Sequence, residues 1–197
     1  MRCIILLFAG VLIVNISLSQ ESAKYLKLKN KILVYKEGYI LDKSGEKIDG
    51  LIKDTDAEES KRSRRIIFLS KTGKKKTYHP SEIDEFEIRY RKYVSSGKLF
   101  YEVIKAGKKI SLLKLSYTGL SGSFSPGTTA PILHETEEFY LKKANQDIYK
   151  LIRKRKFKEE FSDYFSDCEQ LKSKILNDQL NFKDIDHIVF LYNFECK

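Results

Sequence analysis

The two cysteines near the end of the chain, Cys168 and Cys196, are the residues whose type and spacing point most clearly to a chemistry. They lie 28 positions apart, whereas a redox pair usually falls within a Cys-X-X-Cys segment. A structural zinc site needs three or four ligands, and His187 is the only histidine near them in the sequence. The pair therefore predicts a disulfide bond, which requires an oxidising compartment.

Short matches to enzyme motifs occur elsewhere. Ser44 and Lys47 fit an S-x-x-K pattern and Lys71-Thr72-Gly73 fits K-T-G, which together resemble fragments of a penicillin-recognising enzyme. The nucleophile of such an enzyme opens a helix, but Ser44 falls in a predicted turn. The sequence contains no G-x-S-x-G, H-E-x-x-H or P-loop pattern. It predicts no metal site, cofactor or catalytic residue, and it favours a non-enzymatic role.

The start of the chain has the layout of a secretory signal peptide, which we assign to residues 1–19. Arg2 precedes an apolar run over residues 3–14, and the small residues Ser17 and Ser19 follow it. We predict cleavage between Ser19 and Gln20. The mature chain would then be exported to the periplasm, the cell surface or the exterior.

Two features of this segment concern the membrane. Cys3 precedes the apolar run, whereas the lipidated cysteine of a bacterial lipoprotein follows it, so no lipid anchor is expected. The run is also shorter than the ~20 apolar residues that span a bilayer. We therefore predict no transmembrane span in the mature protein.

The chain is strongly basic, with a net charge of +10. The candidate contacts for a polyanion are Arg62, Arg64, Arg65, Lys74, Lys75, Lys76, Arg153, Lys154, Arg155 and Lys156. Outside the cytoplasm such a partner would be anionic lipid or polysaccharide, bound in a salt-dependent way, and nucleic acid is not an expected partner. Acidic residues lie among these clusters, so the alternative is that the basic residues only keep the surface soluble.

Residues 20–152 contain short alternating runs separated by turn signals, and the clearest run has Phe86, Ile88 and Tyr90 on one face. Hairpins in series predict an antiparallel, meander-like sheet, strongly twisted or partly closed into a barrel. Small residues precede the glycines expected to supply positive φ in these turns, which are Gly45, Gly73, Gly97 and Gly107.

The segment Gly119–Pro131 is rich in Gly, Pro, Ser and Thr and is expected to form a loop. Long loops often carry binding or catalytic residues, but they are also where chains tolerate insertions, which is the interpretation we favour here. A small hydrolase that acts on cell-envelope material, with its site near this loop, is therefore the alternative to a non-enzymatic binding or structural module.

Residues 153–197 change to a helical period, with Phe157, Phe161 and Phe165 on one face. Ser166, three residues before Glu169, predicts a capping box, and Asn181 predicts the start of the last helix. A short connection makes the last two helices antiparallel neighbours, which brings Cys168 towards Cys196. We therefore predict a single α+β domain in which the helical segment covers the sheet.

The chain is similar to a broad group of exported, uncharacterised proteins of Gram-negative bacteria. The resemblance covers most of the mature chain, in short pieces: Gly38-Tyr39-Ile40 with Gly50-Leu51-Ile52, Tyr78-x-Pro80-x-Glu82-Ile83 with Phe86, Asp167-Cys168 with Leu171, and Tyr192-Asn193 with Cys196. It implies a periplasmic or surface protein and carries no activity. The function expected is that of an envelope protein whose β-rich body docks another protein or a surface component.

Overall fold

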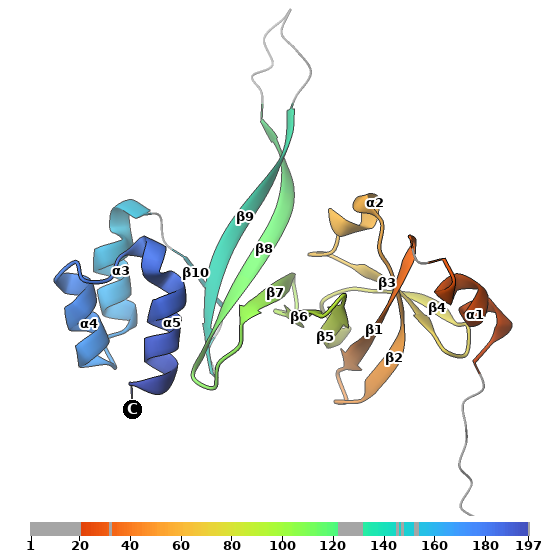
Figure 1. Ribbon diagram of the computed structural model, residues 1–197, viewed down its shortest axis with the longest axis horizontal. Helices are drawn as coiled ribbons and strands as arrows, with labels where there is room; N and C mark the ends of the chain where they lie inside the picture. The colour runs from red at the N-terminus through yellow and green to blue at the C-terminus, as the bar shows by residue number, and fades with distance from the viewer. Residues whose placement is uncertain are drawn as a thin grey trace, which may run out of the picture.

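The computed structural model describes residues 21–31, 33–121, 132–144, 146, 148–151 and 154–196. The predicted signal peptide, its cleavage site and Arg153 lie outside these ranges, as do residues 122–131 of the expected loop. In the described ranges the chain forms an antiparallel sheet followed by helices, so the predicted α+β class is confirmed (Figure 1).

The elements follow one another along the chain in a simple order. The strands are β1 (Tyr35–Asp42), β2 (Lys47–Lys53), β3 (Ile66–Ser70), β4 (Lys75–Tyr78), β5 (Ile83–Ile88), β6 (Arg91–Ser95), β7 (Phe100–Lys105), β8 (Ile110–Ser121), β9 (Ile132–Lys143) and β10 (Ile148–Lys150). The helices are α1 (Ala23–Lys29), α2 (Asp56–Glu59), α3 (Phe157–Tyr164), α4 (Glu169–Leu176) and α5 (Ile185–Phe194), with 3-10 turns η1 (Lys154–Lys156) and η2 (Phe182–Asp184). Over the described residues the strand order is β10-β9-β8-β7-β6-β5-β1-β2-β3-β4.

The first five strands curl strongly. In a flat sheet of this order, β4 and β5 would lie four strand spacings apart, roughly 19 Å. Residues 79–82 alone join these strands, and the Glu82 N–H donates to the His79 carbonyl, which folds the link into a turn. The sheet must therefore bend until β4 approaches β5. Its concave face holds the buried side chains Ile40, Ile52, Ile66, Phe68, Ile83, Phe86 and Ile88, with Tyr93 and Phe100.

The second half of the sheet, β5 to β10, is a meander in which each strand pairs with its sequence neighbour. The hairpin of β8 and β9 is its longest part and projects from the body (Figure 1). Gly119, where the loop was expected to begin, instead pairs with His134 inside this hairpin. The expected boundary was therefore wrong by three residues, because strand pairing extends through Ser121.

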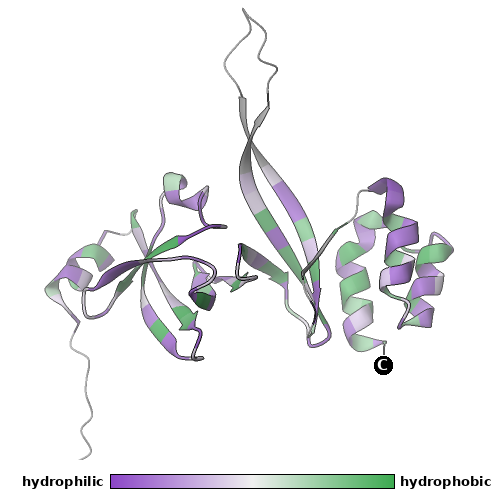
Figure 2. Ribbon diagram, turned by 180° about the vertical axis from the view of Figure 1, so that it is seen from behind, coloured by the Kyte–Doolittle hydropathy of each residue, from purple (hydrophilic) through white to green (hydrophobic). Residues whose placement is uncertain are grey.

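Helices α3, α4 and α5 cover one face at the base of the β8–β9 hairpin. Their apolar sides join the strand residues Ile110, Leu112 and Leu141 in one buried cluster. In Figure 2 these helices carry both hydrophobic and hydrophilic residues, as expected when one side faces the sheet. A disulfide joins Cys168 and Cys196, whose Cα atoms are 5.4 Å apart, so the chain end is fixed to this cap. On the chain-entropy view such a link contributes roughly 3–4 kcal/mol.

The turn glycines serve two different purposes. Gly45, Gly73 and Gly97 have φ of +83°, +85° and +81°, as predicted for tight hairpins. Gly107 is not among the positive-φ residues, so that prediction was wrong. A Cβ at Gly107 would lie 2.3 Å from Asn193 Nδ2, so the position is small because α5 approaches the β7–β8 turn closely.

Two predictions about helix starts have opposite outcomes. Asn181 Oδ1 accepts a hydrogen bond from the Lys183 N–H at 3.0 Å, and the Asn181 N–H donates to Asp184 Oδ2 at 2.8 Å, so a capping box starts the turn η2 that leads into α5. The box predicted at Ser166 is wrong. Helix α4 instead starts after Cys168, which makes no side-chain cap, because the disulfide and the buried face of α4 fix its start.

Candidate functional site

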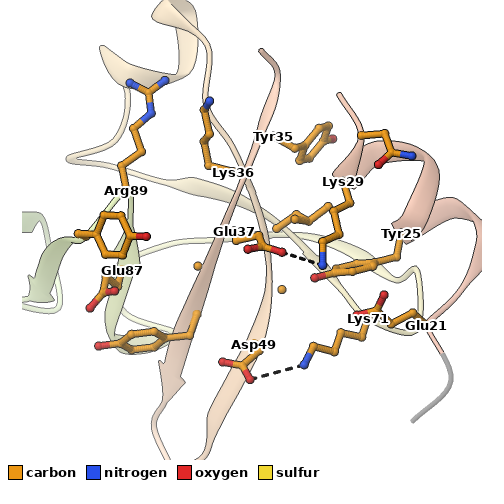
Figure 3. Close-up of a pocket in the computed structure, with 16 residues that line it drawn as sticks. Glu21, Tyr25, Lys29, Tyr35, Lys36, Glu37, Asp49, Lys71, Glu87 and Arg89 are labelled. Carbon is orange, nitrogen blue, oxygen red and sulfur yellow. Dashed lines mark ion pairs between the residues drawn. The ribbon is translucent and has the colours of Figure 1, made fainter. Parts of the chain in front are cut away.

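A groove of about 840 Å³ lies on the convex face of the curled sheet, between α1 and the β5–β6 turn. Alternate residues of β1 and β2 point into it, since Glu37 pairs with Leu51 and Tyr39 pairs with Asp49 across the two strands. Figure 3 shows Glu37 and Asp49 in the middle of this groove. The groove is thus built mainly on a two-stranded floor.

Helix α1 forms one wall and was not expected from the sequence. Ser22 caps it by accepting a hydrogen bond from the Tyr25 N–H at 3.2 Å. Tyr25 is only 2% exposed and packs with Tyr35, Leu51 and Leu69, so the helix is fastened to the sheet by a small core of its own. Burial raises the pKa of both tyrosine hydroxyls.

Two ion pairs lie over the floor of the groove, and one of them comes from helix α1. Lys29 Nζ lies 2.8 Å from Glu37 Oε1, and Lys71 Nζ lies 3.6 Å from Asp49 Oδ2 (Figure 3). The hydrogen bond to Glu37 raises the pKa of Lys29. Both carboxylates are more than half exposed, so each pair contributes only about 0–1 kcal/mol to stability. Their charged atoms therefore remain accessible to a ligand at little cost.

On the β5 side of this floor, Tyr39 contacts two glutamates, of which Glu87 lines the groove and Glu85 does not. The Tyr39 hydroxyl donates to Glu85 Oε1 at 2.8 Å, and Glu87 is the Cα partner of Tyr39 on β5. Burial, together with hydrogen bonds to Glu85 and Glu87, raises the pKa of Tyr39 far above its usual 10.0. Lys47 Nζ lies 3.9 Å from the centre of the Tyr39 ring and covers one of its faces. Tyr39 is therefore held as a neutral donor beside two carboxylates.

The β5–β6 turn at the rim has an uncommon backbone. Arg89 and Tyr90 have φ of 51° and 61°, the left-handed pattern for which two-residue hairpins normally use Asn-Gly. A residue other than glycine in this region costs about 1–3 kcal/mol. The Tyr90 side chain is fully exposed at 100%, so no packing explains its presence there.

A buried charge network holds this turn in place. Asp54, with a side chain 2% exposed, pairs with Arg62 Nη2 at 2.5 Å and also with Arg89 Nε. Arg62 also lies 3.1 Å from Glu59, which in turn is 3.0 Å from Arg91. Hydrogen bonding from Arg91 keeps the pKa of Glu59 below its usual value. The network connects the end of β2 to both sides of the β5–β6 turn.

Arg62 accordingly does not belong with the surface cations proposed as polyanion contacts, because its side chain is 6% exposed and engaged with carboxylates. The other described members of that set remain at the surface. Arg65 pairs with Glu58 at 3.1 Å and Lys76 with Glu82 at 3.0 Å, while Arg64, Lys74, Lys75, Lys154, Arg155 and Lys156 are exposed. The β3–β4 cluster and the η1 cluster lie at opposite ends of the molecule (Figure 1), so the basic residues do not form one surface.

The groove lining limits the chemistry available there. The described residues that line it include carboxylates, lysines, an arginine and tyrosines, but no Ser, Thr, Cys or His. Nowhere in the described ranges do three or more His, Cys, Asp or Glu side chains gather as a metal site would require. Helices long and apolar enough to cross a membrane are likewise absent from those ranges. The groove is therefore suited to binding through rings, hydrogen bonds and charge.

The sequence reasoning did not identify this groove. From the sequence, Tyr39 is only one residue of the Gly38-Tyr39-Ile40 segment, and Tyr90 is only one residue of an alternating run. The available signal was the absence of Gly and Asn from the Arg89-Tyr90 turn. Comparison of the chain with protein-family models, with curated proteins and with solved structures finds no match, so the resemblance to exported bacterial proteins stays a prediction.

Proposed function

We propose that this protein is an exported, non-enzymatic binding module that docks a segment of another envelope protein in the groove against α1. The observation that carries this proposal is the open groove itself, with tyrosines and solvent-accessible ion pairs on rigid strands. Its volume of about 840 Å³ is typical of ligand sites in general.

A protein segment suits this groove better than a small substrate does. Tyrosine and arginine are enriched where proteins meet, because they supply large contact areas with a polar end. The ion pairs that cross the floor offer both donors and acceptors to a polypeptide backbone. The hydrolase alternative has less support, because its expected site lies near the Gly119–Pro131 loop, mostly outside the described residues, and the groove carboxylates Glu37 and Asp49 are each paired with a lysine.

The polyanion alternative also has less support than the groove. Arg62 is buried, and Arg65 and Lys76 each have a carboxylate partner. The remaining exposed cations are divided among Arg64 ahead of β3, the β3–β4 hairpin and η1. Such a distribution is that of an ordinary soluble basic surface.

Export is tested by the intact mass of protein recovered from its host, alkylated before and after reduction. A mass that begins at Gln20, with two alkyl groups added only after reduction, is the expected result, because the disulfide requires an oxidising compartment. A mass that includes residues 1–19, with both thiols free, would contradict export.

Docking is tested with a photo-crosslinking phenylalanine analogue placed at Lys36, which lines the groove, in the exporting host. The matched control carries the same analogue at Lys98, an exposed position in the β6–β7 turn outside the groove. We expect one discrete protein adduct at position 36 that is absent at position 98 and is lost when Asp49→Arg reverses a floor charge. Equal adducts at both positions, or none at 36, would overturn the proposal.

A further inference from the structure

Glu87 differs from the other strand carboxylates of the groove. Glu37 and Asp49 each have a lysine partner, but within the described residues Glu87 forms no ion pair. Its neighbours Lys36 and Arg89 point away from it in Figure 3, and Arg89 instead pairs with the buried Asp54. Lys92, directly across from it on β6, pairs with Glu85 at 2.6 Å instead, so Glu87 faces the groove with no ion pair among the described residues.

Two tyrosines accompany this carboxylate. Tyr39 lies directly across from Glu87 on the neighbouring strand, so their side chains share one face of the sheet. Tyr90 follows three residues later, fully exposed on the left-handed turn. Both tyrosines line the groove. An unfavourable backbone that presents an unpacked ring at the rim of a groove is a feature that folding alone does not require.

The same chain already holds a cation with these groups elsewhere. Lys143 Nζ lies 3.1 Å from Asp167 Oδ2 and 4.6 Å and 4.9 Å from the ring centres of Tyr164 and Tyr192. Rings attract a cation through their electron-rich faces, and a carboxylate adds charge and hydrogen-bond acceptors. In the cap this combination is filled by an internal lysine.

We propose that Tyr39, Glu87 and Tyr90 form a subsite for a cationic side chain, arginine or lysine, of the docked segment. The inference rests on the proposed docking function and adds the chemistry of the partner. The cation bonds to the Glu87 carboxylate and lies against the exposed ring of Tyr90, while the Tyr39 hydroxyl keeps the glutamates oriented. A partner segment without a basic residue would leave this carboxylate unpaired.

The test is an NMR titration of the full mature chain with Nα-acetyl-arginine amide and with its neutral isostere, Nα-acetyl-citrulline amide. We expect saturable shifts confined to residues 39, 87 and 90 and their neighbours, with citrulline at least roughly tenfold weaker. Glu87→Gln should remove the preference for arginine, and the control Glu46→Gln, an exposed carboxylate outside the groove, should keep it. Equal shifts with both compounds, or arginine shifts centred elsewhere, would overturn the proposal.

A second variant distinguishes the contribution of the Tyr90 ring to arginine binding from its effect on folding stability. Tyr90→Gly removes the ring and relieves the left-handed backbone, so we expect a higher melting temperature together with a weaker arginine response. A higher melting temperature with an undiminished response would exclude Tyr90 from the subsite. The two experiments fail distinguishably. An adduct at position 36 without an arginine preference would overturn only this inference, whereas an arginine preference without an adduct would overturn docking and, with it, the assignment of the cation to a docked segment.

Discussion

The two halves of the molecule each contain tyrosines beside a carboxylate, but they use them differently. In the cap, Lys143 lies between Asp167 and the rings of Tyr164 and Tyr192. In the groove, Glu87 lies beside Tyr39 with no cation of its own among the described residues. The internal cation turns the cap cluster into a structural joint, because Lys143 pairs with Asp167 and lies over both tyrosine rings. In the groove, Lys47 covers one face of the Tyr39 ring, but Glu87 has no ion-pair partner among the described residues, so its carboxylate and the exposed Tyr90 ring are available for recognition.

The two regions also differ in what holds them. The cap rests on a large apolar cluster and a disulfide, so its stability comes from burial and from a covalent link. The groove rim depends on the polar network around Asp54, in which the buried Arg62 is paired with two carboxylates. Substitutions in the Asp54 network and in the cap therefore test whether the two regions differ in what stabilises them.

The largest effect is expected at Asp54. Asp54→Asn leaves the guanidinium of Arg62 buried and without its closest carboxylate, so we expect a loss of about 3–5 kcal/mol of unfolding free energy. Chemical denaturation measures this loss. The same variant also releases Arg89 from its partner, so the NMR signals of the β5–β6 turn should broaden or shift.

The matched control is the same substitution in an exposed pair. Asp49→Asn breaks the contact with Lys71, but Asp49 is 58% exposed there, so the expected loss is below about 1 kcal/mol. Similar losses for the two variants would show that the Asp54 network is not the support of the groove rim.

A smaller effect is expected from removing the cation of the cap. Lys143→Met deletes an ammonium that donates to the Tyr164 carbonyl at 2.8 Å and to Asp167, from a side chain that is only 11% exposed. Losing charged hydrogen bonds and ring contacts should cost about 2–3 kcal/mol of unfolding free energy. The neighbouring Lys142→Met, whose side chain is more exposed, should change stability by less than about 0.5 kcal/mol. Equal effects would mean that the cation has no special role in the cap.

Much of the cap could be predicted from the sequence. The four-residue spacing of the phenylalanines follows from helical period, and the structure buries these rings together with both cysteines, which lie just outside the ends of α4 and α5. The hairpin turns at Gly45, Gly73 and Gly97 followed from local backbone preference in the same way. These features depend on residues close together in the sequence, so they can be predicted from the sequence alone.

The groove depends on contacts that no local pattern reveals. In the sequence, Arg62 is only one cation of a basic cluster. In the fold, β5 and β6 return past α2, and Arg62 becomes a buried partner of Asp54. Helix α1 is short and lacks an apolar period, and it persists because Tyr25 packs against Tyr35 and Leu51. From the sequence, Gly107 is a turn residue. In the structure, Asn193 of α5 leaves no room for a larger side chain at this position.

The smallest expected effect is an acid dependence specific to the cap. Burial raises the pKa of Asp167, but the Tyr192 hydrogen bond and the Lys143 ammonium outweigh it, so the pKa is lowered below its usual 3.8. A carboxyl whose pKa is lower in the folded state stabilises the fold above its unfolded pKa and loses that contribution as pH falls through the folded value. The stabilisation from Asp167 should therefore be complete above about pH 4 and disappear below it.

Urea midpoints measured at pH 6 and at about pH 2.5 test this dependence. The wild-type midpoint should fall further than that of Asp167→Asn, because the variant has no carboxyl to protonate at this position. Glu59 and Glu82, whose pKa values are also lowered by their partners, remain in both proteins and set the common background. An identical fall of the urea midpoint in both proteins would mean that protonation of Asp167 does not affect folding stability. The charged groups of the cap would then resemble those of the groove, which contribute little to stability.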